Sequence, residues 1–219
     1  MLYISHGAPT FALEPGPLGP RLRSLGETLA GRVRAVLVWS PHWQTRDLRI
    51  TSGAAPVTMH DFGGFDHGAW VPLLHLFPAA DVPVLQMSMP VDADARSAHA
   101  LGRALAPLRE RGVLIVGSGS LTHNLHELRS PGAAEADYAR RFADWVAGTV
   151  LAGDAAALLD YRRRAPDAAR AHTTEEHFLP LPFAAGASAA GDPVRRLEGG
   201  VTYGVLSMDA YLWGGGEAV

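Results

Sequence analysis

The segment 35–43 constrains the fold most, because it reads as a buried strand that delivers a histidine. Its first residues are apolar and partly β-branched, which is typical of a strand in the interior of a sheet. Proline has no amide hydrogen for the ladder, so we expect the strand to end where Pro41 begins. His42 would then lie at the carboxyl end of a core strand, where open α/β sheets usually place their ligands.

The same arrangement occurs twice more in the chain. Residues 2–5 and 113–116 are short apolar runs, and each is followed by small residues and a histidine, His6 or His123. A histidine after a single strand is in most cases only a polar loop residue. Three of them after three strands of one sheet would converge, and converging neutral imidazoles are typical metal ligands. The residues alone leave both interpretations open: polar loops, or a metal site that uses His6, His42 and His123.

Strand and helix patterns alternate along the chain. Helical spacing of apolar residues covers 18–30, 69–77, 94–110, 134–151 and 154–163, and further strand patterns cover 47–52, 82–89 and 203–212. Strands 35–40 and 47–52 are too close in sequence for a crossover helix, so we expect them to pair antiparallel. The whole pattern predicts one α/β domain over 1–219, with three layers, α/β/α, and a central mixed β-sheet.

The remaining histidines lie in segments of different character. His60 and His67 fall in a glycine-rich and aromatic stretch, 53–68, which reads as a loop. A threonine cap and two glutamates in 171–177 predict a helix start, with His172 at its entry and His177 near its beginning. We expect the side chains of three others to face solvent: His75, His99 and His126.

The composition excludes several classes of function. The 219 residues include ten histidines and no cysteine, so disulfides, thiolate metal sites and thiol nucleophiles are excluded. Any transition-metal site must therefore use imidazole and carboxylate ligands. The formal net charge of -3 gives no reason to expect nucleic acid or a membrane surface as partner. Without a long apolar stretch or a signal pattern, a cytoplasmic protein is expected; the sequence is compatible with an oligomer but does not specify one.

Six segments, taken in order, resemble the class III extradiol ring-cleaving dioxygenases, in particular their DOPA 4,5-dioxygenase-like branch. The matching segments are 4–9, 40–43, 60–65, 65–68, 117–125 and 171–181. They span nearly the whole chain. No single segment is decisive, but their order makes the resemblance specific.

The resemblance implies roles for five histidines. His6, His42 and His177 would bind the metal, so His177 replaces His123 as the third ligand. His123 would be the acid/base residue, and it can also approach the metal as a fourth ligand when zinc is bound. His67 would face the substrate. The implied activity is that of a non-haem Fe(II)-dependent dioxygenase that opens a small aromatic diol, a DOPA-like catechol, with O2.

The residue types agree with that chemistry. Three protein ligands on Fe(II) leave coordination positions for catecholate and dioxygen. Neutral imidazoles leave the full charge of the ion to attract the catecholate. A histidine that titrates near neutrality would suit the proton transfers expected of His123. Glu176 is also placed to support a ligand histidine.

Two alternatives remain, together with one departure from the family pattern. Three histidine ligands and an open coordination position are also typical of zinc-dependent hydrolases, and a non-catalytic binding protein could use the same scaffold. In the family, several tens of residues separate the segments that are fused here at 65–66. Either this insert is deleted, which would displace His67, or the sequence omits it.

Overall fold

The apolar runs of the sequence form the strands of a central sheet. The computed structural model describes residues 1–52 and 65–214. Its strands are β1 (Leu2–Ser5), β2 (Ala35–Thr45), β3 (Val84–Pro90), β4 (Val113–Gly119), β5 (Val194–Leu197), β6 (Val201–Thr202), β7 (Leu206–Ser207) and β8 (Ala210–Trp213). The expected strand over 203–212 is thus divided into β7 and β8, and the sequence patterns did not predict β5 or β6.

Most helices are shorter than their sequence patterns. They are α1 (Leu18–Leu29), α2 (His67–Leu76), α3 (Ala95–Leu105), α4 (Asp137–Leu151), α5 (Ala155–Leu159), α6 (Tyr161–Arg164), α7 (Ala168–Ala171) and α8 (Pro180–Gly186). Three short 3-10 helices join them: η1 (Pro9–Ala12), η2 (Ala106–Arg111) and η3 (Leu125–Glu127). The helix predicted over 94–110 is thus α3 followed by η2, and the one predicted over 154–163 is α5 and α6. None of the helices in the described ranges is long and apolar enough to cross a membrane.

Six strands form a mixed sheet in the order β3-β2-β4-β1-β8-β5. The first four are parallel, with Tyr3 opposite Gly117 and Leu37 opposite Ile115. β8 runs antiparallel to β1, and β5 antiparallel to β8. β6 and β7 form a separate two-stranded ribbon. The mixed sheet agrees with the prediction, and parallel β1, β2 and β4 bring their carboxyl ends to one edge.

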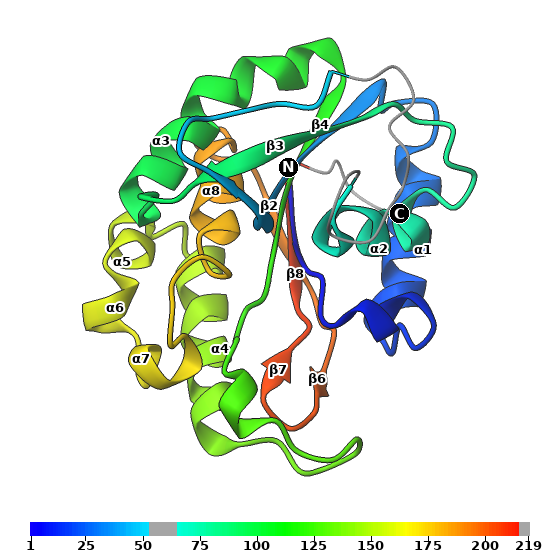
Figure 1. Ribbon diagram of the computed structural model, residues 1–219. Coiled ribbons are helices and arrows are strands. Elements are labelled where there is room, and N and C mark those ends of the chain that lie inside the picture. The colour runs from blue at the N-terminus through cyan, green and yellow to red at the C-terminus, as the bar shows by residue number, and fades with distance from the viewer. Residues whose placement is uncertain (53–64, 215–219) are drawn as a thin grey trace.

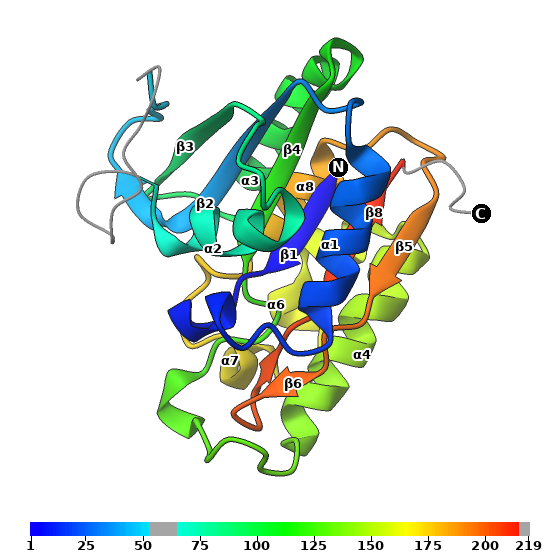
Figure 2. The same ribbon diagram turned by 90° about the vertical axis from the view of Figure 1, so that its right-hand side faces the viewer.

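Helices cover both faces of this sheet, as the three-layer prediction requires. Figure 1 shows α1 and α2 on one side, and α3, α4 and α8 on the other; Figure 2 shows α1 and α2 in front of the strands. Alternate residues of each strand face the two sides, so Ile4 packs in the core under α1 whereas Tyr3 packs in the core under α4 and α8. Buried Leu22 and Phe183 are typical of the helix residues that complete the two cores.

Pro41 interrupts β2 but does not end it, contrary to the prediction. Pairing of β2 with β4 stops at Trp39. Pairing with β3 shifts register between Trp39 and Gln44 and then continues to Thr45. Because proline cannot donate to the ladder, the strand loses its regular pairing at this point and resumes it two residues beyond His42.

The strand predicted over 47–52 has a different partner from the one expected. It forms one antiparallel bridge, from Ile50 to Met87 of β3, and does not pair with β2. Two backbone hydrogen bonds flank the bridge: Thr51 N donates to Gln86 O at 2.9 Å, and Ser88 N donates to Arg49 O at 2.8 Å. The antiparallel part of the sheet therefore comes from β8 and β5.

Two further segments differ from the sequence expectations at positions that matter for the site. The predicted helix start over 171–177 is a turn, because α7 ends at Ala171 and α8 begins at Pro180, so His177 lies between two helices. α2 begins at His67, two residues earlier than expected, because the Asp66 side chain caps it by accepting from Ala69 N. His60, Asp61 and most of the predicted 53–68 loop lie outside the described residues.

Candidate metal centre

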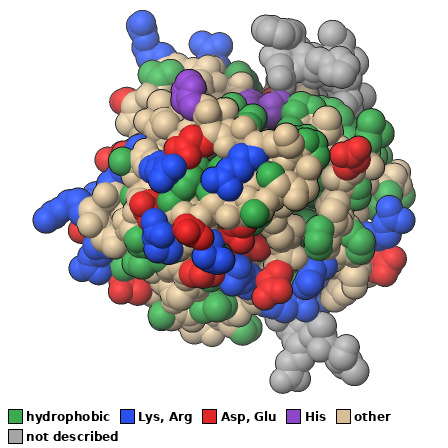
Figure 3. Space-filling model, turned by 90° about the horizontal axis from the view of Figure 1, so that it is seen from below, with side chains coloured by type: hydrophobic (Ala, Val, Ile, Leu, Met, Phe, Trp, Pro, Cys, Tyr) green, Lys and Arg blue, Asp and Glu red, His purple; other side chains and the backbone are tan. Residues whose placement is uncertain are grey.

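Five histidines lie at the edge of the sheet where the parallel strands finish. His6 follows β1 directly, His42 lies in β2 just past Pro41, and His123 lies four residues beyond β4. His67 is the first residue of α2, and His177 precedes α8. His6 and His177 are buried, and the other three are half-buried. Figure 3, which views the molecule of Figure 1 from below, shows histidine side chains in purple at the surface.

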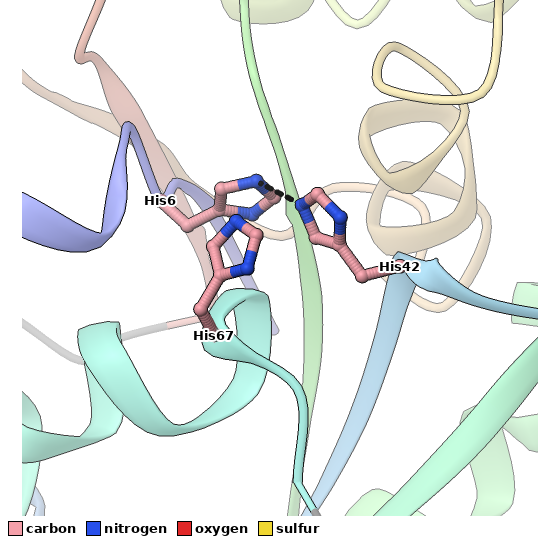
Figure 4. Close-up of side chains that lie close together, drawn as sticks. All are labelled: His6, His42 and His67. Carbon is pink, nitrogen blue, oxygen red and sulfur yellow. Dashed lines mark hydrogen bonds between the residues drawn. The ribbon is translucent and has the colours of Figure 1, made fainter. Parts of the chain in front are cut away.

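His6, His42 and His67 form one group. The Nε2 atoms of His6 and His42 are 3.1 Å apart. The ring centroid of His67 lies 3.8 Å from that of His42 and 5.4 Å from that of His6. One ligand atom from each residue lies within 4.8 Å of the others, and Figure 4 shows the three rings pointing toward one another. This group is suited to bind a metal ion.

His123, Glu176 and His177 form a second group. The rings of His123 and His177 are stacked, with centroids 3.5 Å apart and planes 8° apart. Glu176 Oε1 lies 3.0 Å from Nδ1 of His177, and ligand atoms of all three residues lie within 4.8 Å of one another. The third ligand that the resemblance implies, His177, thus belongs to the second group, whereas His67 lies in the first.

The two groups adjoin one another through His177. Its ring centroid is 5.0 Å from that of His42 and 5.7 Å from that of His6, while His6 and His42 are 4.9 Å apart. An imidazole nitrogen binds a zinc ion at about 2.0–2.1 Å, so the centroids of neighbouring ligand rings lie roughly 5 Å apart. By the distances between their centroids, the rings of His6, His42 and His177 lie about as far apart as three ligands of one ion, although their ligand atoms fall into two groups.

The donor atoms also fit a cation. Nε2 of His177 is buried, and it has no hydrogen-bond partner among the described residues. A buried polar atom without a partner is costly, and a metal ion would satisfy it. The Nε2 atoms of His6 and His42 face each other at 3.1 Å, so one ion can bind both. The set of neutral nitrogen donors suits Fe(II) or Zn(II).

Burial keeps His6 and His123 unprotonated. Burial, reinforced by the neighbouring histidines, lowers the pKa of His6 well below its usual value. Burial, followed by the proximity of His177, lowers the pKa of His123 to about 4. The expected titration of His123 near neutrality is therefore not found in the metal-free protein. The hydrogen bond from His177 lowers the pKa of Glu176 to about 2, so this carboxylate is ionised.

A buried carboxylate holds the start of α2 in place. Asp66 Oδ1 accepts from Ser40 Oγ at 3.0 Å and from Ala69 N at 3.1 Å, and Oδ2 accepts from the Gln86 side chain. Burial raises the pKa of Asp66. These contacts join α2, which begins at His67, to β2 and β3. The sequence analysis gave Asp66 no role; its position directly before a helix was the available signal.

Two of the other histidines differ from expectation. His75 is buried rather than exposed, and its Nε2 donates to Phe11 O at 2.9 Å. His172 is buried and donates from Nε2 to Leu121 O at 2.9 Å. It also bridges in parallel to His123, so it supports the loop that carries His123. His126 is exposed as predicted, and His99 is half-buried.

Comparisons with known proteins identify the family of the chain. The family model described as the catalytic LigB subunit of aromatic ring-opening dioxygenase matches residues 53–203. The chain is 30% identical to a 4,5-DOPA dioxygenase extradiol of Beta vulgaris, over 95% of this chain and 94% of that protein. It is 29% identical to a protein of the same description from Escherichia coli K12, over 94% and 92%.

A solved structure has the same fold. It is the crystal structure of an uncharacterized protein from Escherichia coli K12, which matches with a TM-score of 0.78 at 26% sequence identity. The match covers 96% of this chain and 97% of that one. The three-layer arrangement around a mixed sheet is therefore shared along nearly the full length of both chains.

Proposed function

Because the chain belongs to the family of the catalytic LigB subunit of aromatic ring-opening dioxygenases, we propose that it is an extradiol dioxygenase that opens a catechol with O2. Its substrate would be a small aromatic diol of the DOPA type. Two curated relatives that match more than nine-tenths of the chain are described as 4,5-DOPA dioxygenases, which supports this choice of substrate class.

We assign Fe(II) to His6, His42 and His177. The observation that carries the proposal is the buried Nε2 of His177, which has no hydrogen-bond partner within residues 1–52 and 65–214. The ring of His177 lies 5.0 Å from that of His42 and 5.7 Å from that of His6, between centroids. When bound there, Fe(II) would supply a common coordination site for catecholate and dioxygen and the redox chemistry that joins them. Zn(II) can occupy the same nitrogen ligands.

The remaining histidines would handle protons and substrate. His123 is unprotonated at neutral pH, because its pKa is about 4, so its free lone pair can accept a proton from a substrate hydroxyl. Once protonated, it can return the proton when the ring opens. The ring centroid of His67 lies 3.8 Å from that of His42. His67 is therefore placed to donate a hydrogen bond to a substrate hydroxyl held beside His42.

The proposal is tested by anaerobic reconstitution with Fe(II). Oxygenated buffer is then added with catechol or DOPA, while oxygen uptake and the visible absorbance of the ring-opened product are followed. We expect uptake of about one O2 per ring opened, with a yellow product. The Zn(II)-loaded protein is the matched control and should take up none, because zinc has no redox chemistry. Iron bound stoichiometrically without oxygen uptake on either substrate would contradict the proposal.

A further inference from the structure

A serine hydroxyl lies behind the ring of His6. Ser118 Oγ is 3.0 Å from Nδ1 of His6, and it also donates to the backbone carbonyl of Gly68. Both side chains are buried. A hydroxyl has one hydrogen, and here the Gly68 carbonyl takes it, so toward His6 the oxygen can only accept. The proton of His6 therefore lies on Nδ1, and its lone pair lies on Nε2, which faces His42.

A carboxylate occupies the equivalent position behind His177. Glu176 Oε1 is 3.0 Å from Nδ1 of His177, and it also accepts from Thr174 Oγ1 at 2.8 Å. An ionised carboxylate has no hydrogen to give, so His177 must carry its proton on Nδ1. The lone pair of His177 then lies on Nε2, the buried atom that has no hydrogen-bond partner in the described part of the chain.

We propose that Ser118 and Glu176 are positioning residues that fix the tautomers of His6 and His177, so that both rings present Nε2 lone pairs to the metal. The inference rests on the proposed function, because it takes His6 and His177 as ligands. Hydrogen bonds of this kind orient a ligand imidazole and make it more basic. Ser118 leaves His6 with a neutral partner, whereas Glu176 places a negative charge behind His177.

Ser118 also connects the metal site to α2. The carbonyl to which it donates belongs to Gly68, the residue next to His67. A side chain at Gly68 would place its Cβ 2.4 Å from Ser40 Oγ and 3.0 Å from Nδ1 of His6, so only glycine allows this approach. The Ser118 hydroxyl thus links His6 to the first turn of α2.

The test compares two variants with two matched controls. Ser118→Ala removes the acceptor for His6, and Glu176→Gln removes the charge behind His177. Ser120→Ala is the serine control, since Ser120 is buried two residues beyond Ser118 but donates to Thr122 O. Glu175→Gln is the glutamate control, since Glu175 pairs with Arg162 at 2.7 Å. Glu176 is part-exposed, so its variant should fold even where Ser118→Ala does not.

The readouts are the affinity of the metal-free protein for Co(II), by calorimetry, and the tautomers of the histidines, by ¹⁵N NMR. We expect each variant to bind Co(II) about 10- to 100-fold more weakly than wild type, while both controls stay within roughly twofold. In wild type both His6 and His177 should be Nδ1–H tautomers, and the variant of each partner should lose that preference at its own histidine.

Two results separate the failure of this inference from the failure of the proposed function. Wild type that binds Co(II) through His6 and His177, yet shows Nε2–H tautomers or unchanged affinity in both variants, overturns the inference alone. Wild type that binds no Co(II) overturns the ligand assignment, and this inference with it.

Discussion

His177 is the residue on which the ligand assignment depends most. Two histidines compete for the third position beside His6 and His42. The ring of His67 is the nearer to His42, whereas the buried Nε2 of His177 has no hydrogen-bond partner among the residues that the structure describes. A buried imidazole nitrogen needs a partner within the protein or an ion. This requirement favours His177 as the ligand and leaves His67 for the substrate.

The two candidates can be separated by substitution. His177→Ala should abolish stoichiometric Fe(II) binding, because it removes the buried donor, whereas His67→Ala should retain the iron and weaken catechol binding. Iron content after gel filtration and KM for catechol measure the two effects. Retained iron in His177→Ala together with lost iron in His67→Ala would assign the third position to His67.

A second pair of variants separates metal binding from proton transfer. His42→Ala should lose the metal, since Nε2 of His42 lies 3.1 Å from Nε2 of His6. His123→Ala should keep the metal, but its turnover should fall by about 10²- to 10⁴-fold, the usual contribution of a general base. Metal content and kcat are measured on the same preparations. Stoichiometric metal in His42→Ala would show that the site is wrongly placed.

His172 predicts how the stability of the metal-free protein depends on pH. Burial lowers the pKa of His172 to about 3, so between pH 6.5 and 3 the unfolded chain binds a proton that the native protein does not. The free energy of unfolding should therefore fall as the pH falls through this range. In His172→Gln, which cannot titrate, the slope should be smaller by up to about 1.4 kcal/mol per pH unit. Urea unfolding from pH 7 to 4 measures it, and an unchanged slope would contradict the account.

At the scale of elements, close packing of α3 against α8 supports the face of the sheet opposite α1 and α2. Gly102 of α3 lies against the backbone of Phe183 in α8, and a Cβ on Gly102 would stand 2.0 Å from that carbonyl oxygen. Gly186 of α8 has the reciprocal relation to the carbonyl of His99. Two helices can approach this closely only where one side chain is absent.

Gly102→Ala should therefore destabilise the protein. Overpacking of this kind costs about 1–3 kcal/mol, more than alanine gains from its higher helix propensity. Gly148→Ala is the control, because a Cβ on that exposed residue of α4 would meet nothing within 4 Å. The control should gain about 0.5–1 kcal/mol. Equal effects of the two substitutions in thermal unfolding would show that α3 and α8 are not in close contact.

The elements that the sequence predicts best are those with a regular apolar period. β1, β2 and β4 are short apolar runs that become buried parallel strands, so their strand-end histidines reach one edge of the sheet. The burial of His75 was not predicted, because α2 is apolar on nearly all sides and the spacing of its residues does not show which face is exposed to solvent. The partner of 47–52 was missed because sequence proximity favoured β2, whereas the pairing of this segment with β3 depends on tertiary contacts.

The supporting contacts of the site were the least predictable from sequence. Ser118 and Asp66 act through hydrogen bonds to residues far along the chain or to backbone atoms, and no periodicity encodes such contacts. Glu176 differs, because its partner His177 is the next residue and the sequence already suggested this support. The order of segments along the chain carried more information, because it identified the family that the family model also matches.

At the scale of the whole molecule, the sheet brings distant segments to one site. His6 and His177 are far apart in sequence, yet their rings lie 5.7 Å apart because β1 and β4 are neighbours and α8 packs beside them. Gly117 and Gly119 of β4 permit this packing, since a Cβ on either would stand within 2.3 Å of a backbone oxygen in 177–180. The fold thus sets the spacing of the proposed ligands.

The most direct test of the proposed function is the origin of the oxygen atoms in the product. The Fe(II)-loaded protein is given DOPA under ¹⁸O2, and the ring-opened product is analysed by mass spectrometry before its oxygens exchange with water. An extradiol dioxygenase should place two ¹⁸O atoms in each product molecule, and His123→Ala should form little product of any kind. A product that carries no ¹⁸O, with its new oxygen derived from water, would identify a hydrolase and contradict the account.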